Sequence, residues 1–228
     1  MKNIVCFILL VLLGFIVKAQ ESGEIEFGTE YKSMTIDTSK ISDHRRKDFY
    51  VSQANNAKMA LKGDRSYFKV KFNNEGALTE KIPIMKPDNG LAPYMYSMMT
   101  EQLYIENIPY SIRNIGGKVF YVKYKNIFTP WKITDETKSI LGYKCRKAIT
   151  YFNSERIKNK DPIIAWFTEE IPASYGPYRY YGLPGFILEV YELGRRHYAR
   201  KITLNKKVKI DFPKEEELYT QEEFRNRK

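Results

Sequence analysis

Residues 175–190 read Tyr-Gly-Pro-Tyr-Arg-Tyr-Tyr-Gly-Leu-Pro-Gly-Phe-Ile-Leu-Glu-Val, an aromatic loop that leads into a turn and then a strand. Pro184 presets its φ near the value that the second position of a turn needs, and Gly185 can take the positive φ of a type II turn. Leu183 precedes a proline and is therefore expected to be extended. Together with Gly182, these residues predict a rigid signature turn that fixes the register of the following strand.

The residues after the signature turn alternate as in a β-strand. Their side chains divide between two faces, with Phe186, Leu188 and Val190 on one and Ile187, Glu189 and Tyr191 on the other. Because a shift of one residue would exchange the two faces, the pattern predicts a half-buried strand with a fixed register.

Residues 182–187, Gly-Leu-Pro-Gly-Phe-Ile, resemble the signature of the GLPGLI family of Bacteroidetes proteins. Two upstream stretches, 131–148 and 165–177, resemble the second and third blocks of that family in the same order. Phe186 stands where the family name has leucine, which is an exchange of one apolar residue for another. The resemblance implies an exported, β-rich protein of undefined biochemical role. It also implies an association with outer-membrane uptake or assembly systems, TonB-dependent receptors first among them.

Residues 1–19 have the composition of a secretory signal peptide. A lysine follows the first methionine, residues 4–17 are almost entirely apolar, and small residues lie at the two positions that signal peptidase reads. We expect cleavage between Ala19 and Gln20. The apolar run is too short and wrongly flanked for a membrane span, so we expect no transmembrane segment in the mature chain.

The positions of the two cysteines bear on localisation. Cys6 lies inside the signal, and no cysteine follows the apolar run, so the lipid-modified cysteine of a lipoprotein is absent. The mature protein is therefore expected in the periplasm. Cys145 is then its only cysteine, which excludes an intramolecular disulfide.

The chain of 228 residues is basic, with a formal net charge of +11. Such a charge suits nucleic acid, an anionic envelope surface or simple solvation. Export, the scattered positions of the lysines and the lack of a nucleic-acid or phosphate-loop motif argue against nucleic acid. An anionic envelope surface and simple solvation both stay open.

Short apolar stretches separated by turn residues recur about ten times along the chain. They predict a mainly β protein with minor α, built as a curled antiparallel sheet or half-barrel covered by one or two short helices. We expect a single domain over residues 20–213. Residues 214–228 begin with acids and end with bases, which suits a charged C-terminal helix or tail. Inside the domain, the polar residues 135–140 predict a turn or helical kink.

Motifs of known catalytic or metal sites do not occur in the sequence, and we expect no catalytic residue, cofactor or metal. The alternative is an envelope hydrolase or thiol enzyme with an unrecognised site. Its centre would be Cys145, or Glu169 paired with a distant acid such as Glu189. Because Arg146 points to the other face of a strand, Cys145 is expected to be a small buried side chain.

Tyrosine is abundant, with 18 residues, and several tyrosines precede the signature turn. Flat rings beside a rigid turn suit binding, because they offer contact area at a low cost in entropy. The alternative is that they pack beneath the loop. The candidate binding surface consists of Trp166, Tyr175, Tyr178, Tyr180 and Tyr181.

Together these features predict an exported periplasmic protein of the envelope that is not an enzyme and that binds a hydrophobic ligand or a protein partner. An accessory role in outer-membrane uptake or assembly would make an outer-membrane protein, such as a TonB-dependent receptor, the partner. We expect no binding to nucleic acid.

Overall fold

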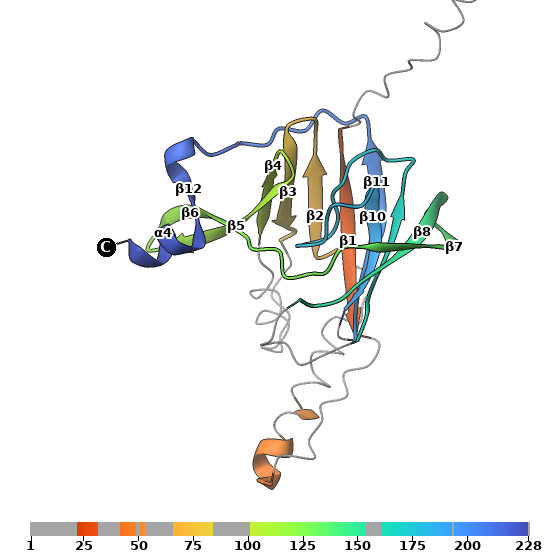
Figure 1. Cartoon of the computed structure of the whole chain (residues 1–228), viewed down its shortest axis with the longest axis horizontal. Coiled ribbons are helices and arrows are strands. Elements are labelled where there is room, and N and C mark those ends of the chain that lie inside the picture. Colours follow the sequence, from red (N-terminus) through yellow and green to blue (C-terminus); the bar gives the residue numbers. More distant parts are fainter. Residues whose placement is uncertain are drawn as a thin grey trace, which may run out of the picture.

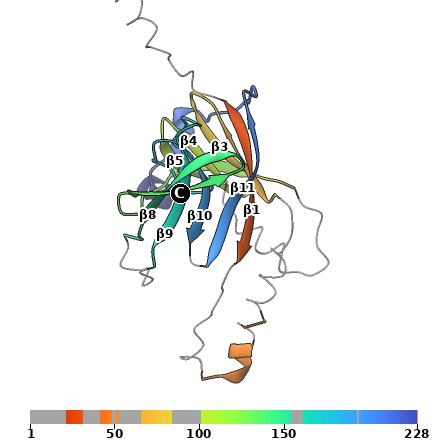
Figure 2. The ribbon, with the colours of Figure 1, turned by 90° about the vertical axis from the view of Figure 1, so that its right-hand side faces the viewer.

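The computed structural model describes residues 22–31, 42–48, 51–52, 66–83, 101–153, 161–192 and 194–227. The expected signal segment and its cleavage site between Ala19 and Gln20 lie outside these residues. The described part confirms the prediction of a mainly β protein with minor α. It forms one curled sheet that does not close into a barrel (Figure 1, Figure 2).

Twelve strands of the described residues form this sheet, in the order β12-β6-β5-β4-β3-β2-β1-β11-β10-β9-β8-β7. Their bounds are β1 Gly23–Tyr31, β2 Phe68–Phe72, β3 Gly76–Lys81, β4 Gln102–Ile105, β5 Ile108–Ile115, β6 Lys118–Lys123, β7 Lys132–Ile140, β8 Tyr143–Thr150, β9 Ile163–Thr168, β10 Phe186–Glu192, β11 Arg195–Leu204 and β12 Leu218–Tyr219. Neighbouring strands are antiparallel except β12 and β6, which are parallel.

Two successive meanders make up the sheet. Strands β1 to β6 are neighbours in chain order, and so are β7 to β11. The pairing of β1 with β11 joins the two meanders, with Gly23 opposite Leu204 and Glu30 opposite Arg196. The middle of the sheet therefore depends on contacts between segments that are far apart in the sequence.

Alternation of apolar and charged residues explains the strands, as β2 illustrates. Its Phe68, Val70 and Phe72 are buried, whereas Lys69 and Lys71 point to the other face. The lysines form ion pairs there with carboxylates of β1 and β3. One face of this strand thus belongs to the core and the other to a charged surface, as the period of two requires.

The turn or kink predicted for residues 135–140 is wrong, because β7 continues through them. The pairing of β7 with β8 shifts register between Ile133 and Thr137, which is a bulge that accommodates extra polar residues. Since β7 lies at the end of the sheet, its polar side chains stay in contact with solvent. An edge strand therefore does not need the apolar alternation on which the prediction relied.

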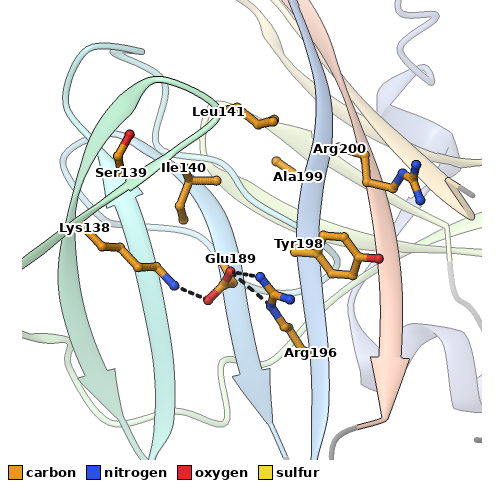
Figure 3. A pocket seen from close by; sticks show the side chains of 9 residues that line it. All are labelled: Lys138, Ser139, Ile140, Leu141, Glu189, Arg196, Tyr198, Ala199 and Arg200. Carbon is orange, nitrogen blue, oxygen red and sulfur yellow. Dashed lines mark hydrogen bonds and ion pairs between the residues drawn. The ribbon is translucent and has the colours of Figure 1, made fainter. Parts of the chain in front are cut away.

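The sheet curls strongly at its β7 end. Strand β7 is three positions from β10 in the sheet, which would be about 14 Å in a flat sheet. Lys138 of β7 nevertheless forms an ion pair with Glu189 of β10. The β7–β8 hairpin therefore leans back over β10 and β11, as Figure 3 shows.

Residues 169–185, between β9 and β10, pack against one face of the sheet. The indole N–H of Trp131 donates to the carbonyl of Tyr181 over 2.9 Å, and the hydroxyl of Tyr104 donates to the carbonyl of Tyr178. The N–H of Ile187 donates to the carbonyl of Tyr175 over 2.8 Å. The aromatic loop is thus tied to this face of the sheet, opposite the leaning hairpin.

The segment after β11 covers the opposite face. Tyr104 contacts the aromatic loop, so the neighbouring Leu103 points to the other face, where it packs with Tyr110, Ile210 and Phe212. The 3-10 turn η1 (Glu215–Glu217), strand β12 and helix α4 (Gln221–Asn226) follow, at the β6 end of the sheet (Figure 1). Among the helices of the described residues, none combines the length and apolar composition that crossing a membrane needs.

The signature turn is tighter than the predicted type II turn. The N–H of Gly185 donates to the carbonyl of Leu183 over 2.8 Å, which closes a three-residue turn around Pro184. Gly185 has the positive φ that was predicted, 157°, and Gly182 has a positive φ as well, 86°. Gly185 is needed for space, because a Cβ there would lie 2.1 Å from the carbonyl oxygen of Thr168.

The prediction of a half-buried strand after the turn is also wrong. Every residue of β10 except Tyr191 is buried, including Glu189 and Glu192. The strand lies between β9 and β11, the aromatic loop covers one of its faces, and the leaning hairpin lies over the other. A strand buried on both faces must supply partners for its charged side chains.

We expect Gly185→Ala to lower the free energy of unfolding by about 2–3 kcal/mol, because the new methyl group meets backbone that cannot move freely and φ of 157° is also unfavourable for alanine. Gly182→Ala is the matched control in the same turn. A Cβ there meets nothing within 4 Å, so only the strain of its φ, about 1 kcal/mol, remains. Urea unfolding of both variants measures the difference, and equal losses would contradict the proposed role of Gly185.

Candidate functional site

Glu189 is a carboxylate buried in the sheet. It lies on β10 opposite Trp166 of β9 and Tyr198 of β11, and only 1% of it is exposed. A buried carboxylate is tolerated when ionic and hydrogen-bonding partners surround it. Lys138 of β7 and Arg196 of β11 approach it from either side (Figure 3).

These partners bind the two carboxylate oxygens separately. Arg196 Nη2 and Nε lie 2.7 and 3.1 Å from Oε2 of Glu189, and Lys138 Nζ donates to Oε1. Arg196 Nη1 also lies 3.1 Å from Oε1 of Glu30 on β1. We call Lys138, Glu189, Arg196 and Glu30 the charged row. It connects four strands, so it fixes the hairpin over the sheet.

Aromatic rings support both cations of the charged row. Lys138 Nζ lies 4.4 Å from the centre of the Trp166 ring, and the guanidinium of Arg196 lies 4.5 Å from that of Tyr198. Rings in this position attract cations and limit their movement. The charged groups are therefore held in place before any ligand arrives.

Glu189 has a lowered pKa. Burial by itself raises the pKa of this carboxyl, but the hydrogen bonds and positive charges of Lys138 and Arg196 outweigh burial and bring the pKa below its ordinary 4.5. The group is therefore ionised at neutral pH and has no proton to donate.

An open groove of about 400 Å³ lies beside the charged row, between the tip of the β7–β8 hairpin and β11 (Figure 3). Its lining residues are Lys138, Ser139, Ile140, Leu141, Glu189, Arg196, Tyr198, Ala199 and Arg200. Three of them are cations and one is a carboxylate, and Glu30, which pairs with Arg196, supplies a second carboxylate beside the lining.

The structure separates the five aromatic residues of the predicted binding surface. Tyr175 and Tyr180 are buried in the core, at 2% and 1% exposure, so they cannot contribute to a surface. Tyr178 and Tyr181 are partly buried against the main core. Trp166 lies on β9 under Lys138, next to the groove. The loop tyrosines mainly pack, and only Trp166 lies close to the site.

Glu192, a second buried carboxylate, anchors the aromatic loop. Arg179 and the hydroxyl of Tyr180 both donate to it, and Arg195 Nη2 lies 3.5 Å from its Oε1. The guanidinium of Arg179 also lies 5.6 Å from the ring centre of Phe128. These contacts give Tyr180 a structural role, since they tie the loop to the end of β10.

His197 lies in the core near this anchor. It is 4% exposed, and its Nδ1 lies 2.9 Å from Oγ1 of Thr29. Burial, and after it the charges of Arg195 and Arg179, lowers its pKa to about 3. The imidazole is therefore neutral at physiological pH.

The residues of the alternative enzyme hypothesis lie toward the β7 end of the sheet, where the charges of Lys138, Glu189 and Glu170 act on the thiol of Cys145. Cys145 is buried, and burial raises the pKa of its thiol to about 12, which leaves almost no thiolate at neutral pH. Glu169 pairs with Arg146 over 3.0 Å, and Glu170 accepts a hydrogen bond from the N–H of Lys144 over 2.8 Å. Both acids are exposed, and Glu189 is bound to its own cations.

Metal ligands are not gathered in the described ranges. There, no group of three or more histidine, cysteine, aspartate or glutamate side chains is placed to hold an ion. The residues that line the groove carry charged and hydroxyl groups.

Sequence reasoning missed three residues of the groove, Lys138, Arg196 and Arg200. One signal was present, because Glu189 is the only charged residue between positions 182 and 191. A lone carboxylate in an apolar strand indicates a buried charge, which requires cationic partners. Which cations supply them depends on the curl of the sheet, and the sequence pattern does not show that curl.

We expect the stability of the protein to fall as the pH drops below about 4.5, and Glu189→Gln to reduce this dependence. A carboxyl whose pKa is lowered by folding stabilises the fold above its unfolded pKa, and this contribution is lost as the group becomes protonated. At pH 7 the variant should lose about 1–3 kcal/mol, since Lys138 and Arg196 lose their shared partner. Urea unfolding at pH 7 and pH 3.5 measures both effects, and parallel pH curves would refute this role of Glu189.

The lowered pKa of His197 predicts a second pH dependence of the stability, at higher pH than that of Glu189. Its folded pKa of about 3 lies below the ordinary 6.5, so the unfolded chain takes up a proton that the folded chain refuses. Stability should fall by up to about 1.4 kcal/mol per pH unit below pH 6.5. His197→Gln should lack this slope between pH 6 and 5, whereas His44→Gln, at an exposed position, should retain it. A wild-type slope in His197→Gln would exclude the imidazole as its source.

Comparisons with known proteins give a partial family match. A family model described as "Protein of unknown function (Porph_ging)" matches residues 150–189, and this family belongs to the Bacteroidetes. The matched part begins at the end of β8, includes the signature turn and ends at Glu189. A search of curated proteins gives no match.

Among solved structures, the chain is similar to PNGF-II in two crystal forms. The form in space group C2 gives a TM-score of 0.53 and the form in space group P21 a TM-score of 0.50, each at 16% sequence identity. The similarity covers 83% of this chain but 28% and 29% of the PNGF-II chains. The chain thus spans less than a third of the length of the structures it matches, and at this identity the likeness shows a shared β fold alone.

Proposed function

We propose that this chain is an exported envelope protein, related to the GLPGLI family, that binds its ligand without catalysis. The signal-like residues 1–19 support export. The three sequence blocks over residues 131–190, together with the partial match to a Bacteroidetes family, support the relationship. The periplasm is the proposed location.

Binding without catalysis is proposed because the reactive groups near the site are held in inactive states. Glu189 is ionised and already bound by two cations, which disfavours a role as a general acid. Cys145 is a buried neutral thiol. Among the described residues near the groove, this leaves preformed charges and rings, which are the features of a recognition site.

The ligand that we propose carries a carboxylate. The observation behind this is the set of cations in the groove, where Lys138, Arg196 and Arg200 line the wall together with one buried carboxylate. The fork of Arg196 already binds Glu189 and Glu30, so its geometry is suited to carboxylates. The hydrophobic ligand expected from the sequence fits this groove less well. A protein partner, such as an outer-membrane receptor, can present the required group.

We expect N-acetyl-L-glutamate methylamide to bind at millimolar concentration, with a saturable shift of the indole N–H signal of Trp166 in NMR spectra of the labelled protein. Arg200→Gln should weaken binding at least about five-fold, because it removes a cation of the groove. Lys201→Gln is the matched control, since it removes the same charge from the next residue, outside the groove. Absence of a saturable shift, or equal weakening by both variants, would refute the proposal.

A further inference from the structure

One edge of the sheet ends at β7. At the opposite end, the chain's own β12 pairs with β6, whereas β7 has β8 on one side and no further strand of the described residues on the other. An edge with unpaired backbone groups can accept a strand from another chain.

Only half of the β7 edge is protected against the addition of another strand. The bulge between Ile133 and Thr137 interrupts the regular ladder, and Asp135 and Glu136 are exposed there. Bulges and charges of this kind hinder the addition of strands. From Thr137 to Ile140 the pairing with β8 is regular. The unprotected half is thus the part of β7 that lines the groove.

The hairpin turn shows which backbone groups face outward. Leu141 and Gly142, with φ of 50° and 89°, form a two-residue loop between the paired Ile140 and Tyr143. In such hairpins the pair next to the loop is hydrogen bonded, and the pairs then alternate. By this alternation the N–H and C=O groups of Ser139 and Thr137 point away from β8, toward the open edge.

Leu141, at the tip of the β7–β8 hairpin, independently indicates that a partner contacts this part of the groove. It is 51% exposed although it is a large apolar side chain, and its positive φ is strained for leucine. Strained conformations that persist often serve a function. Leu141 also lines the groove, so a strand lying there would cover it.

We propose that the partner contributes an extended acidic segment, which adds to residues 137–140 of β7 as a further strand and places a carboxylate in the groove. This inference rests on the proposed function for the carboxylate but adds the backbone pairing and the kind of partner. Alternate side chains of the segment would face Arg196 and Arg200 on β11. Charge complementarity thus selects a segment that alternates acidic and apolar residues.

The test uses a synthetic peptide of about eight residues that alternates glutamate and valine, and a second peptide with lysine in place of glutamate. We expect Ser139→Pro to lower the affinity for the glutamate peptide at least about ten-fold. Proline removes an outward N–H of β7 without breaking a hydrogen bond to β8. Ser139→Ala is the comparison, since it removes the hydroxyl but keeps the N–H, and it should weaken binding of this peptide far less than Ser139→Pro does. Fluorescence anisotropy of the labelled peptides measures the affinities.

Two results would overturn strand addition: equal affinity of the glutamate peptide for Ser139→Pro and Ser139→Ala, or equal binding of the lysine and glutamate peptides. The proposed function is tested separately, since N-acetyl-L-glutamate methylamide should still give a saturable shift of the Trp166 indole N–H signal with Ser139→Pro. If Ser139→Pro does not fold, amide hydrogen exchange of the wild-type protein tests strand addition instead. Saturating glutamate peptide should then slow exchange at Thr137 and Ser139, and unchanged exchange there would overturn the inference.

Discussion

Burying the carboxylate of Glu189 requires cations on both sides of it, and the shape of the β7–β11 half follows from this requirement. Arg196 comes from the adjacent strand, whereas Lys138 reaches Glu189 only because the sheet curls. A buried pair is costly to break, since the remaining charge stays without solvent or partner. The hairpin is thereby held over β10 and β11, which creates the groove and places the outer edge of β7 beside it.

Much of the fold was predictable from the sequence because it follows local rules. The alternation in β2 and the Gly116-Gly117 turn between β5 and β6 both specify antiparallel neighbours. Prediction was wrong where tertiary contacts override a local pattern. Residues 135–140 look like a turn because they are polar, but an edge position and a bulge make them a strand. Gly185 suggested a type II turn, but its role is to let the chain pass close to Thr168.

The candidate site was less predictable, for a different reason. Tyrosines near a rigid turn are typical of both binding surfaces and packed loops, and composition does not distinguish the two. Here Tyr180 bonds to Glu192 and Tyr175 lies in the core. The residues that line the groove come from β7, β10 and β11, and no spacing in the sequence relates Lys138 to Arg196. The lone acid in an apolar strand was the available clue.

The pairing of β1 with β11 affects the order in which the protein folds. Each meander consists of hairpins that can form early, since their strands are close together in the chain. Gly23 and Leu204 meet only after all the residues between them have been synthesised, so this pairing carries the largest loop-closure entropy in the described sheet. Until that moment both strands present open edges, and a newly made chain is then most exposed to aggregation and to chaperones.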